Sequence, residues 1–259
     1  MSTLLVAKKD FQDAIRSQSL LGVSFLFTSF LAFLLYYKIT LETPAEPFLL
    51  SELYLPMASV VALVGTLLGY NAIAGEIESG SVLFLLGTAH TRTDVLFGKL
   101  LGRGAVVAVT VLVGFGVCAP HYAVLIESSP EILTYATLAG KILSLGIVFV
   151  AIAIGFSAVF QSETLAVWGG VCLAAGFSFG WDSFLAVIKT FMFTSLTLPP
   201  WYYLLTRLNP KYAYLSIDAA ALEYAPFYLD AWFGLVILAG WVVAPLGIAY
   251  WQFSRGDLA

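Results

Sequence analysis

The sequence predicts an all-α polytopic membrane protein with six transmembrane helices, and three observations lead to this fold class. The chain is 60% hydrophobic and only 11% charged over 259 residues, whereas a soluble domain carries about 25% charged residues. Six stretches without Asp, Glu, Lys or Arg run for 18 to 24 residues, close to the roughly 20 helical residues that cross a bilayer. Because lipid offers no partner to an unpaired backbone amide, we expect these stretches to be helical.

A single transmembrane domain is expected to fill residues 1–259. Its first span should remain as an anchor, because it is longer than the apolar region of a signal peptide and lacks a small-residue cleavage site. The expected parts are an N-terminal amphipathic helix in 1–19, a cytoplasmic loop in 76–103, an outer loop in 182–230, and spans at about 20–37, 53–75, 104–126, 142–162, 164–181 and 231–254.

The N-terminal segment has the pattern of an interfacial helix. Leu4, Ala7, Phe11 and Ile15 recur at helical spacing, which predicts an apolar stripe facing the membrane surface. A short positioning anchor and a partner-binding surface are both open interpretations of this helix.

The loop in 76–103 is the most patterned polar part of the chain. An apolar block at 82–86 is followed by Gly87, which suits a helix C-cap. Thr91 and Asp94 have the spacing of a capping box that opens the next helix. We therefore expect a short helix, a turn and a second helix, which together form a rigid protrusion for a soluble partner to grip.

The apolar run at 190–206 is predicted to be a re-entrant or interfacial segment of the outer loop. Pro199-Pro200 removes two amide donors and prevents a continuous helix. Trp201, Tyr202 and Tyr203 follow, and such residues favour the bilayer interface. The run is therefore not counted as a seventh span, and both termini are expected on one side.

The distribution of Lys and Arg favours cytoplasmic termini in a multi-pass protein of the cell membrane. On this orientation the basic residues inside are Lys8, Lys9, Arg16, Arg92, Lys99, Arg103 and Arg255, and those outside are Lys38, Lys141, Lys189, Arg207 and Lys211.

Three Gly-x-x-x-Gly pairs could let helices approach closely, at 65/69, 98/102 and 176/180. Packing inside the subunit is favoured over contacts between copies.

The signatures of an enzyme or a nucleic-acid-binding protein are missing. The chain has no phosphate-binding loop of the Walker type and no basic run. Its histidines, His90 and His121, are predicted on opposite sides of the membrane, and neither Cys118 nor Cys172 has metal-ligand spacing. Glu163 is read as part of a short cytoplasmic turn. Neither a metal site nor a cofactor is expected in this chain.

Several motifs taken in order resemble the permease subunits of ABC-2 type transporters, a family that includes a branch for copper-enzyme maturation in archaea and bacteria. The inner loop matches first, from Gly75 to Gly80 and again from Arg92 to Leu101. The other matches are Ala7-Lys8-Lys9-Asp10-Phe11 near the N-terminus, Asn209-Pro210 before the last span, and Phe253-Ser254-Arg255-Gly256-Asp257-Leu258 at the end.

The resemblance implies a half-transporter, with an exporter the expected direction. Two copies of the chain, expected as a homodimer, would enclose a pathway through the lipid bilayer. Two separate ABC ATPase subunits would bind ATP and Mg. The residues implied to contact the ATPase as a coupling helix are Glu76, Glu78, Ser79, Gly80, Val82, Leu83, Phe84 and Leu85, with Arg92 and Lys99 framing the return helix. Ile77 departs from the family pattern, where many relatives carry a basic residue.

Other functions remain open at this stage. A membrane-embedded assembly factor or scaffold would share the spans without an ATPase partner. A secondary transporter is disfavoured because the six stretches carry no charged residue to relay ions. A membrane enzyme is disfavoured for want of catalytic residues.

Overall fold

The computed structural model describes residues 2–38, 40, 46–78, 91–125, 132–160, 162–193, 198–217 and 226–255. Every regular element in these ranges is helical. Six helices in them are long and apolar enough to cross a membrane: Ser19–Tyr37, Glu52–Glu76, Arg92–Val124, Ile132–Ser157, Glu163–Met192 and Ala231–Gln252. The predicted fold class is therefore confirmed.

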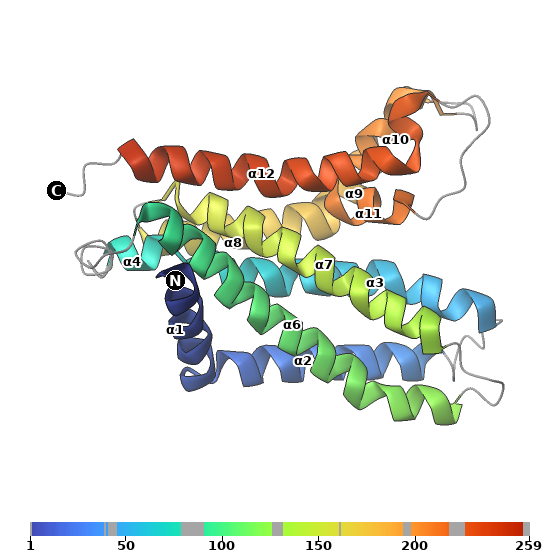
Figure 1. Ribbon diagram of the computed structural model, residues 1–259. Helices are drawn as coiled ribbons and strands as arrows, with labels where there is room; N and C mark the ends of the chain where they lie inside the picture. Colours follow the sequence, from blue (N-terminus) through green and yellow to red (C-terminus); the bar gives the residue numbers. More distant parts are fainter. Residues whose placement is uncertain are drawn as a thin grey trace.

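The long helices lie side by side, and one short helix crosses their end (Figure 1). That helix is α1, at the same end as α4 and the last turns of α12, while α10 and α11 lie at the opposite end. The elements are α1 (Ser2–Arg16), α2 (Ser19–Tyr37), α3 (Glu46–Gly69), α4 (Ala74–Glu78), α6 (Arg92–Leu125), α7 (Ile132–Ser157), α8 (Glu163–Ala175), η2 (Gly176–Gly180), α9 (Trp181–Met192), α10 (Pro200–Arg207), α11 (Pro210–Ile217), η3 (Phe227–Leu229) and α12 (Ala231–Arg255).

The centre of the bundle is the contact between α3 and α7, the two most deeply buried spans. A Cβ added at Gly65 would lie 2.8 Å from the carbonyl oxygen of Gly146, and one added at Gly69 would lie 2.6 Å from Cβ of Ala153. Only glycine permits this approach of the two backbones, which brings many atoms into dispersion contact. Packing of this pair inside the subunit is confirmed.

The fifth span continues past residue 181, where its charge-free stretch ends. α8, the π-helix η2 and α9 follow one another without a break up to Met192. Asp182 is accommodated because Lys211 Nζ lies 2.7 Å from its Oδ2 and the hydroxyl of Tyr212 donates to its Oδ1 at 2.7 Å. A Cβ added at Gly176 would meet nothing within 4 Å. Packing inside the subunit, expected for the 176/180 pair, is therefore wrong at Gly176.

The apolar run at 190–206 is not one continuous helix, as predicted, and two short helices follow the break. α9 ends at Met192 and α10 begins at Pro200. Pro200 suits the first helical position because it has no amide hydrogen. Asn209 lies between α10 and α11 and is fully buried. Its side-chain amide donates to the carbonyl of Phe177 in η2 at 2.8 Å, and its oxygen accepts from the backbone amide of Lys211 at 3.1 Å.

Polar contacts of Asn209, Lys211 and Tyr212 thus attach α11 to the π-helix and to the start of α9. Lys211 is 3% exposed, and its Nζ also donates to the carbonyl of Ser178 at 3.0 Å. Burial, and secondarily the hydrogen bond to Asp182, raise the pKa of Tyr212 above its usual value, so its hydroxyl remains a donor. The Asn-Pro motif therefore joins the outer segment to the fifth span.

Replacing Asn209 with alanine should loosen this joint. Asn209→Ala leaves the carbonyl of Phe177 without that donor, and an unsatisfied buried polar group costs about 1–3 kcal/mol. We expect a lower unfolding temperature for the detergent-purified protein, measured by fluorescence-detected gel filtration after heating. Ser183→Ala is the matched control, because the Ser183 hydroxyl is exposed and bonds only within its own helix, to Phe179. An equal fall in unfolding temperature in Asn209→Ala and Ser183→Ala would contradict the role of Asn209 in this joint.

Candidate functional site

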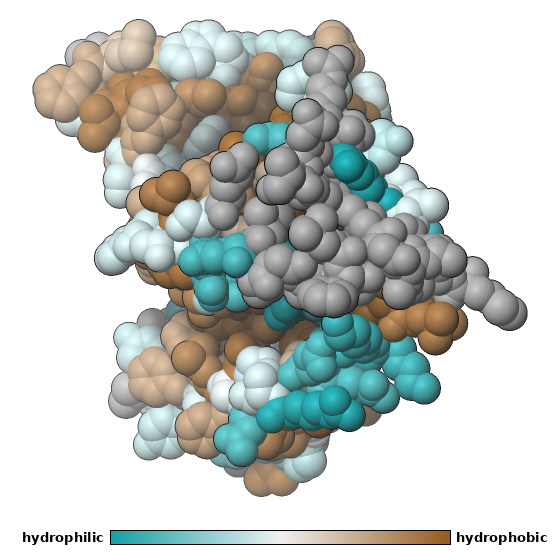
Figure 2. Space-filling view, turned by 90° about the vertical axis from the view of Figure 1, so that its left-hand side faces the viewer, coloured by the Kyte–Doolittle hydropathy of each residue, from teal (hydrophilic) through white to brown (hydrophobic). Residues whose placement is uncertain are grey.

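The predicted coupling loop leaves the bundle at the end where α1, α4 and the first turns of α6 and α8 meet (Figure 1). Figure 2 looks onto this end, and hydrophilic side chains gather over its lower part, where α1 lies. The exposed polar residues of α1 are Lys8, Lys9, Gln12, Asp13 and Arg16.

The face of α1 turned into the protein contains Val6, Ala7, Asp10 and Ala14, and Phe11 packs against the core. Ala7 and Phe11 of the predicted stripe therefore face the protein and not the membrane surface. Leu4 and Ile15 are 72% and 49% exposed, so that half of the stripe is free to face the membrane surface.

Two glycines of α6 explain which face of α1 is buried. A Cβ added at Gly98 would lie 2.6 Å from Cβ of Val6, and one added at Gly102 would lie 2.8 Å from Oδ2 of Asp10. These positions accept α1 only because they lack side chains. The 98/102 pair therefore packs inside the subunit, as predicted.

A cluster of four charged side chains joins α1, α4 and α6. Lys99 Nζ lies 2.9 Å from Oε1 of Glu76 and 3.5 Å from Oδ1 of Asp10. Arg103 Nε lies 2.9 Å from Oδ2 of Asp10, in a close charge contact that lacks hydrogen-bond geometry. Lys99 and Asp10 are 5% and 6% exposed. Because buried charges require partners, the four side chains hold one another in place.

The N-terminus of α6 is closed by the predicted capping box. The backbone amide of Thr91 donates to Oδ2 of Asp94 at 3.0 Å, and the amide of Asp94 approaches the Thr91 hydroxyl at 3.2 Å. The other Asp94 oxygen accepts from the hydroxyl of Thr3 at 2.5 Å. The capping box is confirmed, and it also binds α1.

The other side of the loop is fixed by contacts of the α3–α4 connection with α7 and α8. The hydroxyl oxygen of Ser157, at the end of α7, accepts from the backbone amides of Ile73 and Ala74 at 3.1 Å each. The Glu78 carboxylate accepts from the backbone amide of Glu163 in the first turn of α8. Asn71 Nδ2 donates to Oε1 of Glu163 at 3.1 Å. Glu163 therefore lies at the predicted turn between the fourth and fifth spans.

Of the predicted site residues, Glu76, Glu78, Arg92 and Lys99 fall within the described ranges and gather at this end of the bundle. Arg92 begins α6 and is partly exposed, whereas Lys99 is turned into the protein. The remaining predicted contacts, Ser79, Gly80, Val82, Leu83, Phe84 and Leu85, lie outside the described residues.

Sequence reasoning missed Asp10, Arg103 and Ser157 as members of this site. A signal for Asp10 existed, since an acidic residue stands between the small apolar residues Ala7 and Ala14 at helical spacing. Ser157, inside an apolar stretch, carries no such signal.

The polar side chains at this end of the bundle attach the residues that flank the loop to the neighbouring helices. Among the described residues, no group of three His, Cys, Asp or Glu side chains is placed to hold a metal ion. The residues that flank the loop on either side, at 78 and 91, are each bonded to the bundle. A force applied to the loop would therefore reach α1, α6 and α8 through short polar contacts.

Comparison with known proteins identifies the family of the chain. The family described as "ABC-2 family transporter protein" matches residues 4–258. The chain is 29% identical to a protein of Pseudomonas aeruginosa named "Probable ABC transporter permease protein NosY", with 96% of this chain and 97% of that protein covered. It is 28% identical to a protein of the same name in Stutzerimonas stutzeri, with 84% and 81% covered. With six membrane-crossing helices and a family match over nearly its whole length, the chain belongs to the ABC-2 transporter family.

Proposed function

We propose that this chain is the membrane-spanning permease subunit of an ABC transporter driven by ATP hydrolysis in separate ATPase subunits. Two copies of the chain enclose the transport pathway, and two ATPases with bound ATP and Mg attach through the loop at 79–90. The observation that carries this proposal is that both sides of the loop are bonded to the bundle, at Glu78 and at the capping box of Thr91 and Asp94. The residues that flank the loop are thus held in place, which the transfer of a displacement from the loop to the bundle requires.

The proposed orientation places this end of the bundle in the cytoplasm. The ATPases work where ATP is available, so the loop, α1 and the end of α12 face that side. The excess of Lys and Arg among the residues assigned to this side agrees with the orientation. Both termini of the chain are then cytoplasmic, in the cell membrane.

The proposed mechanism is alternating access with export. ATP binding draws the two ATPases together and displaces the loop. The displacement passes to α8 through Glu78 and to α1 and α6 through Asp94. Lys99 takes part indirectly, because its buried side chain joins α4 to α6 and is not presented to a partner. The pathway between the helices suits an apolar or amphipathic substrate, since the spans contribute few polar side chains.

Substitutions in the loop test the ATPase contact. Glu78→Arg removes an acceptor from the start of α8 and reverses the charge, while Phe84→Ala truncates the largest apolar side chain of the predicted contact. We expect each to weaken binding of the partner ATPase about tenfold or more, because truncated anchor residues typically cost more than about 1 kcal/mol. Glu78→Gln, which keeps an acceptor oxygen, should weaken binding of the ATPase less than Glu78→Arg does.

The measurement is co-purification of the ATPase with the chain, followed by hydrolysis rates of the complex in proteoliposomes. Lys141→Gln, at the opposite end of the bundle, is the control. Unchanged association and hydrolysis in both Glu78→Arg and Phe84→Ala would reject the coupling assignment. A chain that purifies without any ATPase would favour the scaffold alternative, and transport driven by an ion gradient alone would favour a secondary transporter.

Lys99→Met tests the buried charge cluster. The variant leaves Asp10 and Glu76 without the cation between them, and breaking a buried ion pair costs about 3–5 kcal/mol. We expect a lower unfolding temperature and reduced ATPase stimulation by the chain. Lys99→Arg should retain most of the thermal stability and most of the ATPase stimulation. Lys9→Met changes an exposed lysine of α1 and should change neither, so similar losses in Lys9→Met and Lys99→Met would contradict the role of the cluster.

A further inference from the structure

The C-terminal end of α1 is held close to the bilayer surface. Only Ser17 and Gln18 separate α1 from α2, and Ser19 begins both α2 and a membrane-crossing stretch. Gln18 has a φ of 59°, and the chain turns there so that α1 crosses the end of the bundle (Figure 1). Two residues span at most roughly 7 Å, so α1 cannot move away from the surface at which α2 begins.

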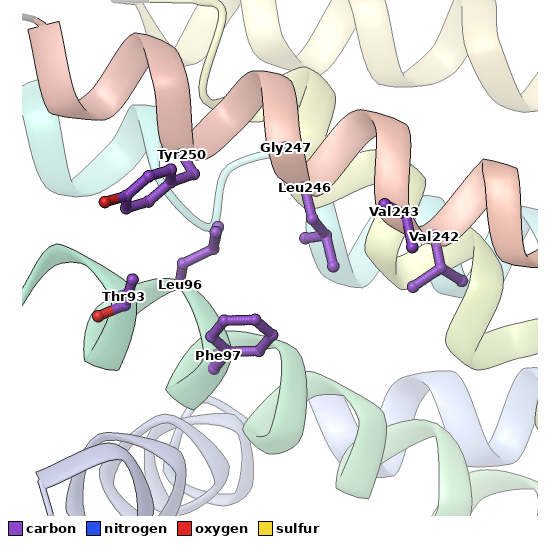
Figure 3. Close-up of a pocket in the computed structure, with 8 residues that line it drawn as sticks. All are labelled: Thr93, Leu96, Phe97, Val242, Val243, Leu246, Gly247 and Tyr250. Atoms are coloured by element: carbon purple, nitrogen blue, oxygen red, sulfur yellow. The ribbon is translucent and has the colours of Figure 1, made fainter.

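The contact with α6 fixes the depth of the rest of α1. Gly98 and Gly102 of α6 accept the helix at Val6 and Asp10. Next to these glycines, Phe97 and Leu101 are exposed on a membrane-crossing helix. Figure 3 shows Phe97 beside the apolar groove between α6 and α12, on a surface without polar lining. α1 therefore lies at the depth where α6 begins to face hydrocarbon.

One part of the exposed surface of α1 is apolar and points toward the inside of the membrane. Phe11 packs against the core that the membrane-crossing helices form, so its side of α1 is turned toward the bilayer. Leu4 and Ile15 are exposed and lie on the same side. At about 100° per residue, Leu4, Phe11 and Ile15 fall within about 40° of one another around the helix. Leu4 and Ile15 thus meet the shallow acyl region of the leaflet.

Lys8 is the basic residue of α1 nearest to this apolar part. It is exposed and lies about 20° beyond Ile15 around the helix, whereas Lys9 lies about 100° further, toward water. A lysine beside an apolar surface keeps its methylene groups on that surface and extends its ammonium group to the polar boundary. The ammonium group of Lys8 therefore reaches the level of the lipid phosphates.

The charge on the exposed face of α1 complements an anionic headgroup. Lys8, Lys9 and Arg16 are exposed there, and Asp13 is the one exposed acid of the helix. Asp10 does not offset this charge, because it is buried against Lys99 and Arg103. An amphipathic helix that lies in the interface with basic residues on its polar side is attracted to anionic lipids.

We propose that α1 binds an anionic phospholipid of the leaflet on its side of the membrane, with the lipid phosphate at Lys8 and the acyl chains against Leu4 and Ile15. Lys9 and Arg16 add to the attraction from the water side without contacting the phosphate. The site depends only on the membrane placement of α1, and it stands whether or not an ATPase binds the loop.

The test compares two adjacent lysines that differ in their position around the helix. A photo-crosslinking benzoylphenylalanine replaces Leu4, and the protein is reconstituted in vesicles of equal amounts of phosphatidylglycerol and phosphatidylethanolamine. After illumination, intact-protein mass spectrometry measures the ratio of the two lipid adducts. Lys8→Gln removes the cation beside the apolar part, and Lys9→Gln removes the same charge one residue further on.

We expect the adducts of the parent to be enriched in phosphatidylglycerol about fivefold, the factor that corresponds to one basic residue at an anionic surface. Lys8→Gln should lose this enrichment, Lys8→Arg should keep it, and Lys9→Gln should change it less than about twofold. Asp13→Asn, which removes an acid from the exposed face, should raise it slightly.

A parent protein without enrichment would overturn the proposal. Equal losses in Lys8→Gln and Lys9→Gln would also overturn it, because the attraction would then come from diffuse charge and not from a site at Lys8. If Lys8→Gln left the adduct ratio unchanged and instead released the partner ATPase during co-purification, this face of α1 would be a protein contact and the lipid site would be rejected.

Discussion

Hydrocarbon offers no hydrogen-bond partner, and this constraint decides how the polar groups of the chain are arranged. Each polar group that enters the bundle must be satisfied by the protein itself. Asp182 and Lys211 meet in the second half of the fifth span, and Asp10 meets Lys99 at the end of the bundle where α1 lies. Between these two polar layers the α3–α7 contact is almost wholly apolar and relies on glycines for close approach. The bundle is thus held at both ends by charge and in the middle by packing.

Polar contacts near the ends of the bundle and apolar packing in its middle suit a protein whose spans move relative to one another. Dispersion contacts are non-directional, so a shift of helices in the middle of the bundle breaks no particular hydrogen bond. The polar layers are directional and hold each attached segment as a unit: α1 with the start of α6, and α11 with η2. Motion is then expected as displacement of these units, and α6, which belongs to one of them, follows the loop at 79–90 in the sequence.

Much of the fold could be predicted from the sequence, because stretches of some 20 uncharged residues have few alternatives to a membrane-crossing helix. The prediction failed where a residue contacts a partner that is distant in the sequence, because the local sequence pattern does not reveal that contact. Asp182 ended the predicted fifth span, yet Lys211, 29 positions later, allows the helix to continue. The buried face of α1 depends on Gly98 and Gly102 of another helix. The candidate site was located by its loop pattern and its capping box, but Asp10 and Arg103 join it only through tertiary packing.

The π-helix at Gly176–Gly180 makes the length of the fifth span matter as much as its composition. Its wide turn takes up one more residue than an α-helical turn would. Loss of a single residue there would restore regular α-geometry and leave Asp182, beyond the turn, on nearly the same face of the helix. The carbonyls of Phe177 and Ser178 would then enter ordinary helical bonding, and Asn209 and Lys211 would lose the acceptors that they use now. Such a deletion would weaken the attachment at the π-helix and spare the ion pair of Asp182 with Lys211.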